Sequence, residues 1–375
     1  MKAPASYTEH DYGRCLDDLA PGDEYRHPFE VTVDAGLIGT YSASFMDACP
    51  MWSSDRYARA YHLPSRPVSP HLAFNLALSM SVHDVSQQGV AHMAYVHVRF
   101  PKPLYAGTTV NAVSRVISAR PSSGLSRGVV HIHTVLLDDH HERVVDLERL
   151  ALVKPGRLTA RPGSPQLHAG DPQGKLWMGH LPSVEMATVL GNTVPSLTRF
   201  DPPLFGCFED LIPGKVFAHA VGRTIGDSEP MQLATLLRNT HPMHVDELHC
   251  RTDGPTPTRM VYGGLVMAWV VSLASIDVGG HLLWDVVWRE GAHPGWVAAG
   301  DTLYAATKVL DAEIVNDYLG LVKVRHVGCM NVRPAQLLDE GADLFSPELA
   351  KPAESRIAGK VFEITRTILV RRFGK

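Results

Sequence analysis

The chain has 375 residues, of which 45% are hydrophobic and 20% are charged, and its formal net charge is −4. This length suits two domains of about 150–200 residues each, with the composition of a globular protein. A slightly acidic chain lacks the basic surface that nucleic-acid binding needs, so we expect no nucleic-acid partner.

The remaining bulk properties predict a cytoplasmic protein without a membrane segment. The N-terminal segment Met1–Arg14 contains no apolar signal-peptide core, and the longest apolar stretch, Leu265–Ile276, is too short to span a bilayer. The odd number and wide spacing of the cysteines favour a reducing compartment over a disulfide framework: Cys15, Cys49, Cys207, Cys250 and Cys329.

Each half of the chain predicts the same order of elements. A short extended stretch precedes a helical segment, a helix that is apolar on nearly every face, and several alternating strands. In the first half the segments are Phe29–Asp34, Leu72–Met80, Met93–Phe100 and Val129–Leu137, and in the second half Val216–Val221, Leu265–Leu273, Leu319–His326 and Val361–Val370. A buried helix followed by antiparallel strands predicts an α+β domain in which a sheet wraps around one helix.

Short motifs recur at a nearly constant spacing, which indicates an internal duplication. The segment Asp47-Ala-Cys-Pro-Met-Trp52 returns 192 residues later (47 to 239) as Asn239-Thr-His-Pro-Met-His244. Ala106-Gly-Thr-Thr109 returns 193 residues later (106 to 299) as Ala299-Gly-Asp-Thr302. We therefore divide the chain into a first copy over 1–154, a linker rich in Gly, Pro and Ser over 155–198, and a second copy over 199–375. Two such sheets placed side by side would join into one and protect their edges.

The densest cluster of polar residues lies in the second copy. His244 is a candidate general acid–base, and Asn239 is placed to hold a water or a substrate carbonyl. Tyr262-Gly263-Gly264 precedes the buried helix, where free backbone N–H groups would stabilise a thioester oxyanion. An acid–base group beside an oxyanion site is the minimum that chemistry on an acyl thioester requires.

These residues also permit structural interpretations. The His-Pro-Met-His turn would serve as a helix cap, and a Gly-Gly pair begins helices in many folds. The spacing of His241, His244, His249 and Cys250 matches no common zinc pattern, so we expect no metal and no cofactor. The first copy has Trp52 at the place of His244 and Pro70-His71 at the place of the glycines, which predicts a degenerate site there.

The sequence resembles the MaoC-like enoyl-CoA hydratases, the (R)-specific hydratase group of the hot-dog superfamily. The family motif is Asp-x-Asn-Pro-x-His-x-Asp followed by a helix-opening His-Gly, and this chain matches it at Pro242, His244, Asp246 and Gly264. The resemblance is greatest to the mesaconyl-CoA (2-methylfumaryl-CoA) hydratases, which are two-hot-dog chains. It implies a tandem hot-dog fold and the addition or removal of water across the C=C of a 2-enoyl thioester.

The resemblance assigns roles to individual residues. It implies that His244 transfers the proton, Asn239 orients water and the Gly264 N–H holds the thioester oxygen. We expect a further set of residues to contact the substrate: Tyr262, Gly263, Asp47 and Trp52. The chain departs from the MaoC-like motif where Asn239 replaces the catalytic aspartate, and the first copy combines Asp47 with Trp52, so neither copy by itself has the complete Asp/His pair.

Two other functions remain open from the sequence. Asp47 resembles the single carboxylate of hot-dog thioesterases, although an aspartate at that position also suits a helix cap. A non-catalytic member would retain the acyl-thioester pocket without turnover. The sequence also leaves open a branched or bulky acyl group, coenzyme A or a carrier protein, the reaction direction, and a homodimer in addition to the pseudo-dimer within one chain.

Overall fold

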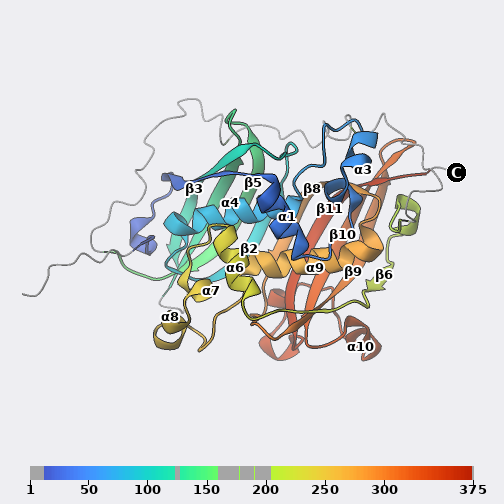
Figure 1. Ribbon diagram of the computed structural model, residues 1–375. Helices are drawn as coiled ribbons and strands as arrows, with labels where there is room; N and C mark the ends of the chain where they lie inside the picture. Colours follow the sequence, from blue (N-terminus) through green and yellow to red (C-terminus); the bar gives the residue numbers. More distant parts are fainter. Residues whose placement is uncertain (1–11, 123–126, 159–176, 178–189, 191–203, 374–375) are drawn as a thin grey trace, which may run out of the picture.

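A single antiparallel sheet forms the scaffold of this computed structural model, which describes residues 12–122, 127–158, 177, 190 and 204–373 (Figure 1). Its eleven strands in the described residues run in the order β1-β3-β4-β5-β2-β8-β11-β10-β9-β6, and β7 also pairs with β9. The strands are β1 (Glu24–Thr32), β2 (Gly89–Arg99), β3 (Thr109–Pro121), β4 (Gly128–Leu137), β5 (Arg143–Val153), β6 (Val216–Ala218), β7 (Arg223–Thr224), β8 (Leu282–Ala292), β9 (Thr302–Ile314), β10 (Leu319–Met330) and β11 (Lys360–Arg371).

Two long helices, α4 (Pro70–Val85) and α9 (Gly263–Val278), lie side by side across one face of the sheet (Figure 1). Nearly every side chain of both helices is buried, as their apolar sequences predict. No helix of the described residues is long and apolar enough to cross a bilayer. The shorter helices are α1 (Ala35–Ala43), α2 (Pro50–Ser53), α3 (Asp55–Ala60), α6 (Glu229–Leu236), α7 (Pro242–Val245), α8 (Glu247–Thr252) and α10 (Pro334–Asp339), with 3-10 turns at Leu16–Asp18, Phe208–Asp210, Glu348–Ala350 and Ala353–Ser355.

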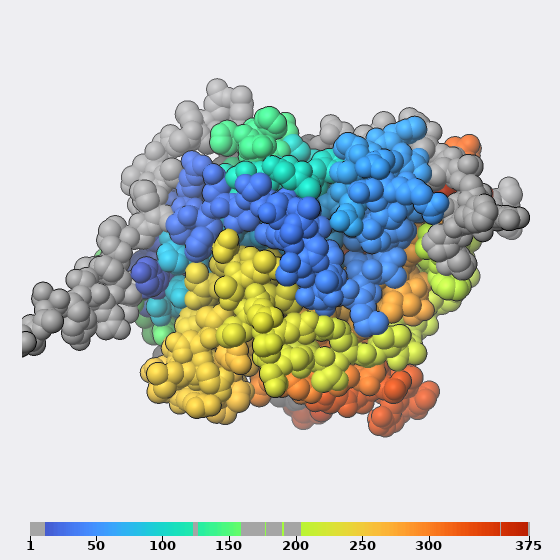
Figure 2. All heavy atoms as spheres, in the orientation of Figure 1, coloured from blue at the N-terminus to red at the C-terminus, as the bar shows by residue number. Residues whose placement is uncertain are grey.

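The N-terminal segment, in blue, and the segment that follows residue 204, in yellow, form a continuous cover over this face of the molecule (Figure 2). The cover contains α1 to α3 from the first half and α6 to α8 from the second half. The two central helices are thereby enclosed between the sheet and these short helices. Such enclosure explains why they carry almost no polar surface.

The two halves of the fold repeat each other and confirm the predicted tandem hot-dog architecture. The start of α9 follows the start of α4 at the spacing of the sequence repeat (70 to 263), and the same holds for β8 after β2 (89 to 282) and β9 after β3 (109 to 302). Antiparallel pairing of β2 with β8, in which Tyr95 faces Gly291, joins the two sheets into one. The bounds 1–154, 155–198 and 199–375 stay a prediction, because most of the linker lies outside the described residues.

A polar triad, which no sequence pattern predicted, links each central helix to the sheet. In the first half, His27 Nδ1 lies 2.8 Å from Asp84 Oδ2, and His27 Nε2 lies 2.7 Å from Ser114 Oγ. The triad recurs in the second half with distances of 2.5 and 2.7 Å, at His219, Asp277 and Thr307. The repeat of this arrangement is evidence for duplication that does not depend on the candidate site.

Candidate active site

A cavity of about 330 Å³ lies where the two halves of the chain meet. The second half contributes Asn239, His244 and Tyr262 to its wall, and the first half contributes His92 and Arg149. Both copies thus build the cavity wall, and the assignment of the active site to the second copy stays a prediction. Because α4 packs directly against α9, the space beside either helix is bounded by elements of both copies.

His244 is held in the cavity wall in a form that suits a general base. Its position is set by the short helix α7, which begins at Pro242. The Nδ1 atom lies 2.9 Å from the carbonyl oxygen of Met260, so Nδ1 carries the proton and donates it to that oxygen. Burial lowers the pKa of His244 to about 4, while the bond to Met260 opposes this shift. At neutral pH the ring is uncharged and the Nε2 lone pair is available to accept a proton.

The neighbouring His241 has a structural role. Its Nδ1 accepts a bond from the N–H of Met243 (3.2 Å) and caps α7, while Nε2 donates to the carbonyl oxygen of Gly89 (3.0 Å). Burial lowers the pKa of His241 to about 3, with a smaller contribution from His244 in the same direction. Both ring nitrogens are occupied, so the helix-cap interpretation holds for His241 and not for His244.

Asn239 presents a hydrogen-bond donor at the wall of the same cavity. Its Oδ1 accepts the N–H of His241 (3.0 Å), which determines the orientation of the amide. The Nδ2 atom is buried and has no partner in the described part of the chain. A buried unpaired amide N–H₂ is costly, and a bound water or substrate oxygen would satisfy it.

The glycine pair begins α9, as predicted, but its two members have different surroundings. Gly263 lines the cavity, and a Cβ at this position would lie 2.9 Å from His293 Nε2. Gly264 lies at the contact between the two central helices, where a Cβ would come within 1.9 Å of Asn75 Oδ1. Both residues belong to the first turn of α9, whose N–H groups have no acceptor within the helix.

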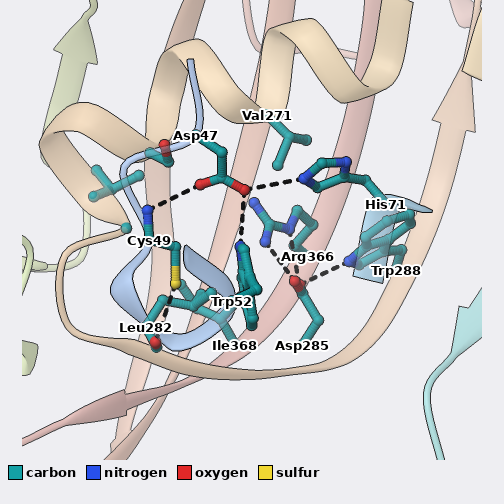
Figure 3. A pocket seen from close by; sticks show the side chains of 13 residues that line it. Asp47, Cys49, Trp52, His71, Val271, Leu282, Asp285, Trp288, Arg366 and Ile368 are labelled. Carbon is teal, nitrogen blue, oxygen red and sulfur yellow. Dashed lines mark hydrogen bonds and ion pairs between the residues drawn. The ribbon is translucent and has the colours of Figure 1, made fainter. Parts of the chain in front are cut away.

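Asp47 and Trp52 line a second and much smaller cavity, of about 10 Å³, which has room for about one water molecule. Asp47 Oδ2 accepts bonds from Trp52 Nε1 (2.8 Å) and from His71 Nε2 (3.0 Å), as Figure 3 shows. Burial by itself would raise the pKa of Asp47, but the bonds and charge of His71, with the N–H of Cys49, hold it below its usual value. The structure therefore does not bring Asp47 and Trp52 into the cavity that His244 lines, and their contact with the substrate stays a prediction.

The small cavity is the counterpart of the large one under the internal repeat. Asp47 and Trp52 precede Asn239 and His244 by 192 residues (47 to 239, 52 to 244). It also brings together an Asp/His pair, Asp47 with His71, that no sequence pattern predicted in the first copy. Since this carboxylate is fully engaged and has almost no open space beside it, Asp47-dependent thioester hydrolysis loses its structural basis.

Acid–base chemistry in the large cavity depends on histidine. None of the described residues that line it is an aspartate or a glutamate. Besides His244, the wall contains His92 and His293, which the sequence did not single out, together with Arg149. The sequence around Arg149, Leu147-Glu-Arg-Leu-Ala-Leu-Val153, places it directly after a glutamate and carries no signal for a binding role.

Comparisons with known proteins identify a family for the chain. The family model described as mesaconyl-CoA hydratase matches residues 5–334. The mesaconyl-CoA hydratase of Cereibacter sphaeroides is 31% identical over 319 residues, which cover 84% of this chain and 89% of that protein. The β-methylmalyl-CoA dehydratase of Chloroflexus aurantiacus is 27% identical over 323 residues, which cover 84% of this chain and 88% of that protein.

Solved structures agree on the fold. A putative MaoC domain protein dehydratase from Chloroflexus aurantiacus superposes with a TM-score of 0.78 at 24% identity, covering 98% of this chain and 100% of that chain. A conserved hypothetical protein of Mycobacterium tuberculosis with a double hotdog fold superposes with a TM-score of 0.68 at 20% identity, covering 96% and 99%.

Proposed function

Because the chain belongs to the mesaconyl-CoA hydratase family, and is thus an enoyl-CoA hydratase or dehydratase, we propose that His244 is its single acid–base group. Two observations in the described part of the chain carry this proposal: the Nε2 of the neutral His244 has no hydrogen-bond partner there, and neither has the Nδ2 of Asn239, which lines the same 330 Å³ cavity. No carboxylate among the described lining residues competes for the role.

In the direction of hydration, a water is held between Asn239 Nδ2, which donates to its oxygen, and His244 Nε2, which accepts its proton. As the proton moves to His244, the water oxygen bonds to C3 of the enoyl group and the C=C electrons shift toward the thioester carbonyl. The resulting enolate oxygen is stabilised by N–H groups at the positive end of α9, where Gly263 lines the cavity and Gly264 lies at the contact between α4 and α9. The His244 imidazolium then returns the proton to C2, and dehydration follows the same steps in reverse.

We extend to this chain the kind of acyl group that the names of its relatives describe. Those names are mesaconyl-CoA hydratase and β-methylmalyl-CoA dehydratase, which denote branched acyl thioesters of coenzyme A. We therefore propose 2-methylfumaryl-CoA as the substrate to test first, with coenzyme A rather than a carrier protein. Tyr262 and Gly263, both in the cavity wall, are the proposed acyl contacts.

The setting of the protein belongs to the same proposal. All five cysteines are free, which supports a reducing compartment such as the cytoplasm. The two hot-dog copies pair within one chain, so a monomer provides a complete cavity.

The test is mass spectrometry of the protein incubated with 2-enoyl-CoA and 3-hydroxyacyl-CoA esters. We expect a change of one water in the mass of the intact thioester. His244→Asn retains a donor for the Met260 carbonyl but removes the base, and is expected to lower the rate by about 10²–10⁴-fold. Asp47→Asn, in the small cavity, is the matched control and is expected to retain the wild-type rate. Release of free coenzyme A, or equal activity of the His244→Asn variant, would contradict the proposal.

A further inference from the structure

Arg149 places a buried positive charge at the wall of the large cavity, and none of the described residues that line this cavity is a carboxylate. The residue is 3% exposed, and its Nη2 group donates to Ser81 Oγ (3.0 Å) and Ser86 Oγ (3.1 Å). Its Nε atom has no partner, and no acidic side chain in the described part of the chain forms an ion pair with it. Burial lowers the pKa of Arg149 to about 10, so the guanidinium is still charged at neutral pH. Such a charge is costly unless a counter-ion satisfies it.

The internal repeat shows what an equivalent arginine binds in the other half. Arg149 in β5 faces Tyr95 in β2, and Arg366 in β11 faces Trp288 in β8. The spacing of the repeat relates Tyr95 to Trp288 (95 to 288), so the two arginines occupy equivalent positions. Arg366 forms a bidentate pair with Asp285, with N–O distances of 2.6 and 2.9 Å.

Figure 3 shows this bidentate pair in the small cavity, where the carboxylate of Asp285 also accepts a hydrogen bond from the indole N–H of Trp288 (2.7 Å). The same spacing relates Asp285 to His92 in the first copy (92 to 285). The arginine is therefore present in both halves, and the carboxylate in only one. In the large cavity, His92 stands at the position of that carboxylate, close to Arg149.

His92 does not replace the missing negative charge. Its side chain is buried, and neither ring nitrogen has a partner in the described part of the chain. Burial, the nearby His293 and the charge of Arg149 hold the pKa of His92 well below 6.5, so the ring is neutral. A neutral imidazole supplies one N–H donor, which adds to the donors of Arg149.

Arg149 and His244 reach the cavity wall from different halves of the chain, Arg149 from β5 and His244 from α7. Burial lowers the pKa of Arg149 only to about 10, so its guanidinium does not exchange protons at neutral pH. A permanent cation suits recognition of the acyl group rather than proton transfer.

We infer that Arg149 is a specificity-determining residue that binds a free carboxylate on the acyl group, in the position that Asp285 takes beside Arg366. This inference rests on the proposed function, because it assumes that an acyl thioester occupies the cavity. A substrate with that carboxylate completes the ion pair that the protein leaves open, and bidentate contact with a guanidinium fixes its orientation. The first copy, with its degenerate counterpart site, thus supplies the group that selects the substrate.

The test compares the binding of two saturated esters, succinyl-CoA and butyryl-CoA, by isothermal titration calorimetry. They differ only in a terminal carboxylate or methyl group. The wild-type protein is expected to bind succinyl-CoA about 10–100-fold more tightly, from the usual strength of hydrogen bonds to charged groups. Arg149→Met is expected to reduce this preference to less than about threefold, and Arg149→Lys to retain part of it.

Two further variants complete the design. His92→Asp places a carboxylate of the protein beside Arg149, as Asp285 lies beside Arg366 in the small cavity. This variant is expected to abolish the preference for succinyl-CoA over butyryl-CoA while the arginine stays in place. Arg120→Met, at an exposed position on β3, is the control and is expected to keep the wild-type preference. Circular dichroism verifies that each variant is folded. If Arg149→Met does not fold, the comparison of His92→Asp with the wild-type protein decides.

Saturated esters cannot be hydrated, so this measurement is independent of turnover. No preference in the wild-type protein, or an unchanged preference in Arg149→Met or His92→Asp, would overturn the inference even if hydration is observed. A clear preference without any hydration would instead support the inference and count against His244 as a catalytic base.

Discussion

Replacing Arg366 and Arg149 by methionine, one at a time, is expected to have very different effects on stability, although the two arginines occupy equivalent positions. Arg366→Met leaves Asp285 buried, with a side chain 1% exposed, and removes the bonds of 2.6 and 2.9 Å. Removing one partner of a buried pair typically costs about 3–5 kcal/mol. Arg149→Met leaves no carboxylate unpaired among the residues that the structure describes.

The expected cost for Arg149→Met is smaller for two reasons. The variant loses the bonds to the hydroxyls of Ser81 and Ser86, but it also removes a charge whose burial the protein does not compensate. We expect these two effects to offset each other to within about 1 kcal/mol. The double variant Arg366→Met/Asp285→Leu removes both charges of the closed pair and is expected to recover most of the stability lost in Arg366→Met.

The assay is urea denaturation at pH 7 without ligand, with the free energy of unfolding obtained by linear extrapolation. Equal losses of stability in Arg366→Met and Arg149→Met would refute the reasoning, because they would mean that Arg149 has a partner equivalent to Asp285. If Arg366→Met does not lower the free energy of unfolding, the pair of Arg366 with Asp285 contributes nothing to stability, and the analogy between the two cavities fails.

Two further predictions concern the packing and the pH dependence of the same region. Gly264→Ala is expected to destabilise the fold by about 1–3 kcal/mol in thermal unfolding, because the added Cβ would lie 1.9 Å from Asn75 Oδ1. The control Gly39→Ala is expected to stabilise the fold slightly, because Gly39 is exposed in α1 and its added Cβ would have no neighbour within 4 Å. Four histidines of the large cavity have lowered pKa values: His92, His241, His244 and His293. As the pH falls below about 6.5, the unfolded chain therefore binds protons at these residues that the native state does not bind. The free energy of unfolding is therefore highest above pH 6.5 and falls as the pH falls toward 4, by up to about 1.4 kcal/mol per pH unit for each histidine. Unfolding temperatures that stay unchanged between pH 7 and pH 5 would contradict the lowered pKa values of these histidines.

Much of the fold is predictable because its strongest signals are local. The apolar runs within α4 and α9 correspond directly to the burial of these helices, whereas β2 shows no regular alternation of buried and exposed residues and no residue of β4 is exposed. Strands β3, β5, β8 and β9 were not predicted; the end of β9, Leu310-Asp-Ala-Glu-Ile314, mixes exposed apolar and charged side chains and has no buried face.

The candidate site was predictable only on the side that carries a motif. His244, Asn239, Tyr262 and Gly263 lie in one cavity, as expected from the cluster in the second copy. Arg149 was missed because an arginine beside Glu148, in a strand that contains other charged residues, indicates nothing until its partners are known. Its role depends on residues far apart in the sequence, which the fold brings to one cavity wall.

The continuous sheet formed by β2 and β8 has a consequence for how such a protein evolves. In a homodimer of single hot-dog chains, every substitution appears at both symmetry-related sites, so one site cannot close without closing the other. Fusion removes that constraint: Trp52 and Asp285 fill one site while His244 and His92 occupy the same positions in the other. Because each cavity uses wall residues from both copies, neither copy can be discarded after this specialisation, and we expect one ligand per chain.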